Sequence, residues 1–107
     1  MATTKVLGQS YPSAATATTL YTASTASGTV VSTINVANLS GAADTIRIAV
    51  RPAGASLSNQ HYVVYGASLG SGSVFTWTAG ATLANTDVIT VYSTNGTSAF
   101  SAFGQEL

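Results

Sequence analysis

The feature that most constrains the fold is an alternation of apolar and polar residues on both sides of a short polar loop, over residues 28–52. A period of two is the spacing of a β-strand that buries one face. We therefore predict two strands that bury the same even-numbered face. The apolar residues of this face are Val30, Ile34, Val36, Ile46, Ile48 and Val50.

The polar loop between the two predicted strands is SGAAD, residues 40–44. Ser, Gly and Asp are typical of loops because they bend the backbone or bond to it locally. If the two strands form a hairpin around this loop, Val36 lies opposite Ile48, and Ile34 lies opposite Val50. A shift of one residue would set Val36 against an arginine and mix the two faces. The pattern thus predicts an antiparallel hairpin in the first register.

Further short β-rich stretches, separated by Gly, Pro and Asn, fill the rest of the chain, and none shows the apolar period of a helix. We predict that Leu20 and Tyr21 point to opposite faces of their strand. The 60–66 strand is apolar on both sides, which indicates an inner strand or an interface, and 79–86 is predicted to be loop. The additional predicted strands are 4–9, 18–24, 60–66, 73–78, 87–92 and a C-terminal strand from Phe100 to Leu107.

Asn95-Gly96 is the strongest hairpin signal in the chain, because a type I′ turn needs positive φ at both of its central positions. A two-residue turn here predicts that Val91 pairs with Phe100, and Val88 with Phe103.

Seven or eight evenly spaced antiparallel strands predict an all-β fold, a single β-sandwich that is immunoglobulin-like or a small jelly roll. One domain over residues 1–107 fits the length of the chain. Residues 1–17 are either a first strand followed by a linker or an N-terminal arm that docks on a neighbour.

The chain carries little charge: 6% of its residues are charged and its net charge is zero, whereas roughly 25% is typical. Weak charge gives weak protection against self-association, so we expect a homo-oligomer. The absence of cysteine excludes disulfides and thiolate sites. The first ten residues lack the apolar run of a secretory signal, and no apolar stretch approaches membrane-spanning length. We expect synthesis in the cytosol and no membrane partner.

Gly66 to Gly70 matches the G-x-S-x-G nucleophile elbow, but strand signals follow it instead of a helix, and His61 precedes Ser68. The carboxylates Asp44 and Asp87 stand at strand starts, where aspartate commonly forms turns. We expect His61, a histidine at the end of a strand, to bond to backbone or to a neighbouring subunit more readily than to act as a ligand or base. We predict no catalytic residue, no cofactor and no metal site, and hence no enzyme.

Arg47 and Arg51 share the odd-numbered face of their strand. They either lie on a solvated face or contact acidic groups of a partner protein. Two arginines are too few for a nucleic-acid surface. With Lys5 and Val6 of the N-terminal segment, they are our candidate partner-contact residues. The aromatic residues are assigned to core packing, with sugar stacking as the alternative if two or three share an exposed face.

Several stretches of the chain resemble small structural proteins in the virions of tailed bacteriophages, including cyanophages. The most telling are Val6-Leu7-Gly8-Gln9, Thr19-Leu20-Tyr21-Thr22, Val30-Val31-Ser32-Thr33 and Arg47-Ile48-Ala49-Val50-Arg51-Pro52-Ala53-Gly54. The resemblance runs over nearly the full length and implies a non-enzymatic virion protein.

Among such proteins, the resemblance favours a capsid decoration or cement protein that binds the major capsid protein and stabilises the assembled head. It implies a location in the virion and no small-molecule substrate. A tail, baseplate, neck or fibre-adaptor protein is one alternative, and a carbohydrate-binding adhesion module is another.

Overall fold

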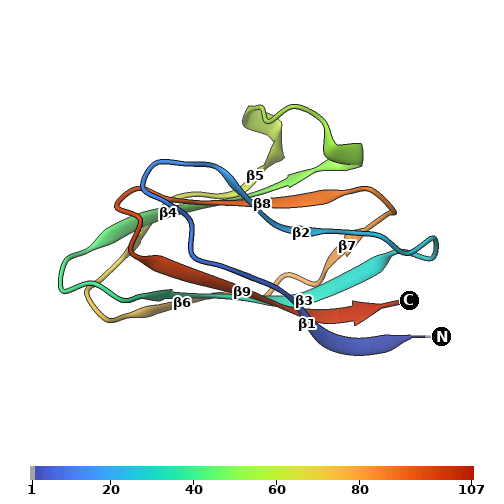
Figure 1. The fold of residues 1–107 in the computed structure, drawn as a ribbon, viewed down its shortest axis with the longest axis horizontal. Coiled ribbons are helices and arrows are strands. Elements are labelled where there is room, and N and C mark those ends of the chain that lie inside the picture. The colour runs from blue at the N-terminus through green and yellow to red at the C-terminus, as the bar shows by residue number, and fades with distance from the viewer. Residues whose placement is uncertain (1) are drawn as a thin grey trace.

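Two antiparallel β-sheets pack face to face in the computed structural model, which describes residues 2–107 (Figure 1). The predicted all-β sandwich is confirmed, with nine strands instead of seven or eight. The strands are β1 (Thr3–Ser10), β2 (Thr18–Thr22), β3 (Thr29–Asn38), β4 (Asp44–Arg51), β5 (Tyr62–Leu69), β6 (Val74–Trp77), β7 (Ala81–Leu83), β8 (Val88–Ser93) and β9 (Ser98–Glu106). Two 3₁₀ turns, η1 (Pro52–Gly54) and η2 (Asn59–His61), lie between β4 and β5.

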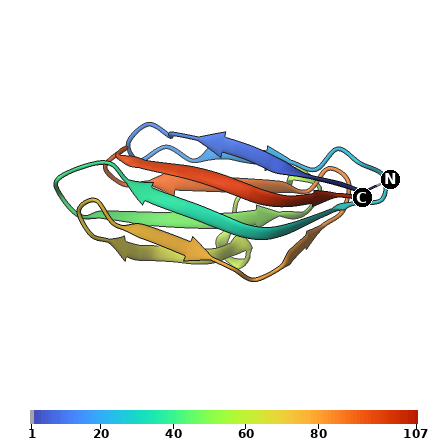
Figure 2. The ribbon, with the colours of Figure 1, turned by 90° about the horizontal axis from the view of Figure 1, so that it is seen from below.

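The five-stranded sheet has the order β1-β9-β3-β6, with β7 also paired to β3, and the four-stranded sheet has the order β2-β8-β4-β5. Figure 2 shows the five-stranded sheet, with the first and last strands side by side and the two chain ends at one end of the sandwich. Residues 3–10 of the predicted arm or first strand are therefore an edge strand of the sheet.

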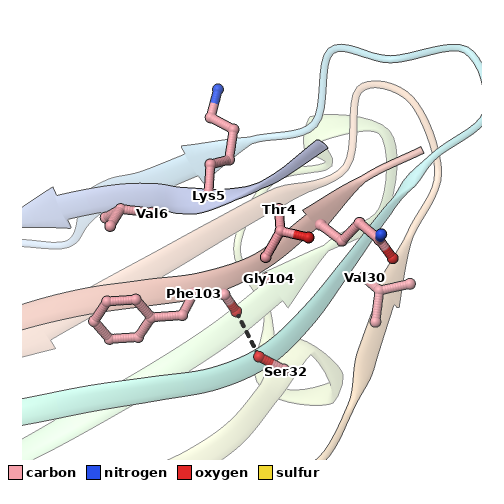
Figure 3. Close-up of a pocket in the computed structure, with 8 residues that line it drawn as sticks. Thr4, Lys5, Val6, Val30, Ser32, Phe103 and Gly104 are labelled. Atoms are coloured by element: carbon pink, nitrogen blue, oxygen red, sulfur yellow. Dashed lines mark hydrogen bonds between the residues drawn. The ribbon is translucent and has the colours of Figure 1, made fainter. Parts of the chain in front are cut away.

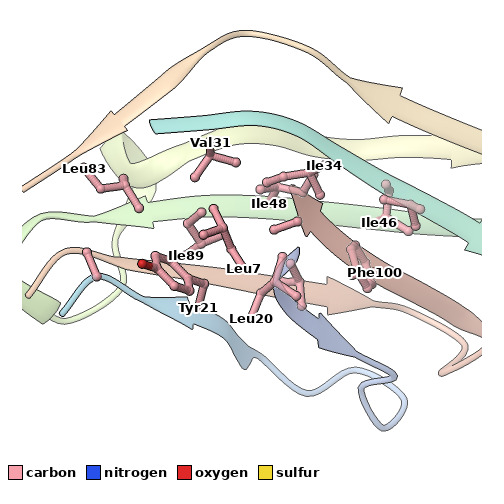
Figure 4. Packing of buried hydrophobic residues seen from close by; sticks show 14 of the residues in the cluster. Leu7, Leu20, Tyr21, Val31, Ile34, Ile46, Ile48, Leu83, Ile89 and Phe100 are labelled. Atoms are coloured by element: carbon pink, nitrogen blue, oxygen red, sulfur yellow. The ribbon is translucent and has the colours of Figure 1, made fainter. Parts of the chain in front are cut away.

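The core lies between the two sheets and is lined by residues of both (Figure 4). Ile34, Val36, Ile46 and Ile48 are fully buried, which confirms the even-numbered apolar face at these positions. Val31 is buried in place of Val30, because a β-bulge shifts the register of β3 against β9 between Val31 and Thr33.

The predicted hairpin of the first two long strands is wrong. β3 belongs to the five-stranded sheet and β4 to the four-stranded sheet, so the two strands face each other across the core. Val36 lies beside Phe100 and Phe75, and Ile48 lies beside Val64 and Val91. An apolar alternation shows which face is buried, but paired strands and facing strands bury that face equally well.

The predicted Asn95-Gly96 hairpin is wrong for the same reason, because the 94–97 loop crosses from one sheet to the other. Gly96 has a φ of 71°, but Asn95 does not have a positive φ, so the type I′ requirement is not met. Val91 pairs with Ile48 and Thr18 instead of Phe100.

Three smaller corrections concern single strands. A register shift in β2 between Thr19 and Tyr21 buries both Leu20 and Tyr21 on one side. Residues 81–83, predicted to be loop, form the short strand β7, whose Leu83 reaches the core. β5 is an edge strand, not an inner one.

Candidate functional site

The four predicted contact residues lie on two different sheets. Lys5 and Val6 are on β1, an edge strand of the five-stranded sheet. Arg47 and Arg51 are on β4, an inner strand of the four-stranded sheet. The structure therefore gives two separate candidate surfaces instead of one.

The first surface is a shallow apolar hollow on the outer face of the five-stranded sheet, with a volume of about 440 Å³ (Figure 3). Val6 is 49% exposed and Phe103 is 37% exposed, so both present apolar area to solvent. The hollow is lined by Thr4, Lys5, Val6, Val30, Ser32, Phe103, Gly104 and Gln105. We call this surface the Phe103 hollow.

Phe103 was not among the predicted contact residues, although its spacing carries a signal. Phe100 and Phe103 are three residues apart, and residues at an odd spacing point to opposite faces of a regular strand. Phe100 is fully buried, so Phe103 points outward. The Ser32 hydroxyl donates a hydrogen bond of 3.1 Å to the Phe103 carbonyl and ties β3 to β9 beside the hollow (Figure 3).

Lys5 forms an ion pair within the chain. Its Nζ forms an ion pair of 3.3 Å with Glu106, which also accepts a 2.7 Å hydrogen bond from the Tyr21 hydroxyl. The hydrogen bond from Tyr21 and that from Lys5 hold the pKa of Glu106 below its usual value. Lys5 thus fastens β1 to the C-terminal end of β9.

Arg51 also has internal partners, which the sequence did not indicate. Its Nε donates to the Thr90 hydroxyl at 3.0 Å, and its Nη1 donates to the carbonyl oxygens of Gly54 and Ala55 at 3.2 and 2.9 Å. Arg51 therefore fixes the η1 turn onto β8.

Arg47 is held differently, between two tyrosine rings on the outer face of the four-stranded sheet. Its guanidinium carbon lies 4.4 Å from the ring centroid of Tyr65 and 4.2 Å from that of Tyr92. The register of the sheet dictates this arrangement, because Arg47 on β4 pairs with Tyr65 on β5 and with Tyr92 on β8. Such cation–π contacts orient the plane of the guanidinium group.

The rings of Tyr62 and Tyr65 form a T-shaped pair, with their centroids 4.8 Å apart. Tyr62 and Tyr65 also line an open hollow of about 470 Å³ together with Asn59. We call Arg47, Tyr62, Tyr65 and Tyr92 the arginine–tyrosine cluster. It is the second candidate surface, and 64% of Tyr65 is exposed there. Trp77, in contrast, packs against the core.

Ser68 of the G-x-S-x-G match and His61 lie at opposite ends of one strand. Ser68 is near the end of β5, whereas His61 is buried in η2, just before β5 begins. The Ser58 backbone N–H donates to Nδ1 of His61 at 3.1 Å, which confirms the predicted histidine bonded to backbone.

Both aspartates bind turns, as predicted. Asp87 accepts backbone hydrogen bonds from Ala53 and Ala84 at 2.8 and 2.9 Å. Asp44 is buried and accepts bonds from two backbone N–H groups and two serine hydroxyls. Over residues 2–107, no three side chains of the metal-binding types gather into one group. The same residues form no helix long and apolar enough to cross a membrane.

Comparisons with protein-family models, with curated proteins and with solved structures found no match to this chain.

Proposed function

We propose that this protein is a non-enzymatic structural component of a phage virion, a decoration protein that binds the assembled head and stabilises it. The observation that carries the proposal is the position of the two candidate surfaces on different sheets of one sandwich. A thin domain with a contact surface on each sheet can bridge two neighbouring subunits. The resemblance of the sequence to virion structural proteins supports the same function.

The mechanism would be the burial of interface area that the undecorated head lacks. Exposed apolar and aromatic side chains such as Val6, Phe103 and Tyr65 supply such area. A protein that binds only the assembled shell shifts the equilibrium toward that shell by mass action. Little surface charge also removes a repulsion that would otherwise oppose packing of many copies.

Imaging of intact particles with the labelled protein tests the proposal. We expect many copies spread over the head, and particles without the protein should release their DNA at a lower temperature. A few copies confined to the tail would show a tail, baseplate or neck component instead. Absence from purified particles would reject a virion function.

A carbohydrate-binding module is the second candidate, because two tyrosines and an asparagine line the open hollow beside Tyr65. Sugar rings stack on exposed aromatic faces and bond to neighbouring polar groups. This function requires binding to a host polysaccharide that Tyr65→Ala abolishes. Failure of the wild-type protein to bind any host polysaccharide would exclude it.

A further inference from the structure

The three cationic side chains of the chain differ in what they bind. Lys5 is paired with Glu106, and Arg51 donates to three oxygens of its own chain. The side chain of Arg47 makes no hydrogen bond or ion pair with any other part of residues 2–107, and its guanidinium group lies against the two tyrosine rings. It therefore keeps a full set of N–H donors for an external acceptor.

The two rings restrict how those donors can point. A guanidinium group is planar, and its N–H bonds lie in that plane and form a donor edge. Arg47 is partly exposed, so the N–H donors that the two rings do not cover can reach a partner. Tyr65 is itself packed against Tyr62 in a T-shaped pair. An unrestrained arginine side chain loses conformational entropy when it binds a ligand. The two rings already restrict the side chain of Arg47, which reduces this entropic cost of binding.

We propose that Arg47 binds the carboxylate of an aspartate or glutamate on a partner protein, through two parallel hydrogen bonds, with the tyrosines packing around it. This inference rests on the proposed function and names the chemistry of one of its contacts. Tyr and Arg, together with Trp, are enriched at energetically dominant interface positions. A planar carboxylate matches the donor edge of the guanidinium group.

The surrounding charges favour a carboxylate over a phosphate chain. Nucleic-acid phosphates are held by several clustered cations, whereas the neighbouring Arg51 is occupied by its own loop and Lys5 lies on the other sheet. Arg47 therefore offers a single oriented positive charge, which matches the single negative charge of a carboxylate.

The test consists of two separate titrations of the purified full chain, one with a ten-residue glutamate-rich peptide and one with the same peptide carrying glutamine in place of glutamate. The arginine Nε–Hε signals are monitored by ¹⁵N NMR in both. We expect the Arg47 signal to shift with the glutamate peptide and not with the glutamine peptide. Arg47→Lys keeps the charge but loses the paired donors, so its affinity should fall about tenfold or more. Tyr65→Phe should retain binding, and Tyr65→Leu should lose most of it.

Gln9→Ala is the control variant, because Gln9 is an exposed polar residue of β1 on the other sheet and lines neither candidate surface, so peptide binding should be unchanged. Equal affinity of wild type and Arg47→Lys would overturn the proposal. So would tighter binding of polygalacturonate, an acidic polysaccharide, than of the glutamate peptide. The titration uses no particles, so its failure is separate from a failure to find the protein on the head.

Discussion

Asp44 is an aspartate in an unusual environment, because its carboxylate is buried. It is 2% exposed and has no cation beside it. Instead its carboxylate accepts bonds from the hydroxyls of Ser93 and Ser98 at 2.5 and 2.6 Å, and from the N–H groups of Thr45 and Asn95 at 2.9 and 3.0 Å. Ser93 ends β8, Asn95 lies in the 94–97 loop and Ser98 begins β9, whereas Asp44 and Thr45 begin β4. Asp44 thus ties the start of β4 to the crossing from β8 to β9.

Burial raises the pKa of Asp44, but the four hydrogen bonds to the charged form outweigh burial, and the pKa lies below its ordinary value. A carboxylate whose folded-state pKa is depressed adds stability above its unfolded-state pKa. That stability is lost as the pH falls through the folded-state pKa. We therefore expect the free energy of unfolding to be steady near neutral pH and to decrease below about pH 4.

Asp44→Asn should reduce the free energy of unfolding by about 2 kcal/mol at pH 7, because the amide nitrogen cannot accept the bonds on its side. It should also flatten the loss of stability at low pH. Urea unfolding from pH 3 to 7 measures both effects, with Asp87→Asn as the control at a partly exposed turn. An unchanged pH profile in Asp44→Asn would show that another group causes the acid sensitivity.

At the scale of the strands, irregularities decide which residues reach the surface. The bulge between Val31 and Thr33 turns Val30 outward beside Phe103 and so helps to form the Phe103 hollow. Gly104 lies opposite this bulge, where a Cβ atom would overlap the carbonyl oxygen of Val30. Close approach of β3 and β9 therefore requires glycine at this position.

Gly104→Ala should destabilise the fold by about 2–3 kcal/mol, because the backbones of β3 and β9 must separate to admit the methyl group. Gly41→Ala is the matched control: no atom lies within 4 Å of its added Cβ, and it should change stability little. Denaturant midpoints of the two variants measure the difference. Equal stability of the two would mean that β9 can shift without cost.

At the scale of the whole molecule, the sheets join segments far apart in the chain. β1 pairs with β9, and β2 pairs with β8. Within residues 2–107, β4 and β5 are the one pair of strands that is consecutive in the chain. Each remaining pairing must first close a longer loop, and such folds form slowly.

We therefore expect the isolated chain to refold in milliseconds to seconds, in one cooperative step. Trp77 packs against the core and reports on it by fluorescence, while far-ultraviolet circular dichroism follows the strands. The two signals should change with the same rate in stopped-flow refolding. Refolding within microseconds would show that local contacts dominate despite the topology.

The candidate surfaces were predictable in part. The sparse charge of the chain singled out Arg47, and the odd-numbered positions of β4 placed it outside the core. That Arg51 and Lys5 have internal partners could not be predicted, because Gly54, Ala55 and Glu106 reach them only through the path of the chain in space. Phe103 was missed because the Asn95-Gly96 hairpin, which was wrongly predicted, paired Phe103 with the apolar Val88 and so gave it a structural role.

The sequence by itself determined the all-β class, most strand positions and the buried face of Ile34, Val36, Ile46 and Ile48, because side chains alternate along any strand whatever its neighbours are. Only the tertiary structure decided which strands pair. Backbone hydrogen bonds are the same for every sequence, so an apolar face does not distinguish a partner in the same sheet from one across the core. That choice rests on non-local contacts such as those of Asp44, and it is what places Arg47 between Tyr65 and Tyr92.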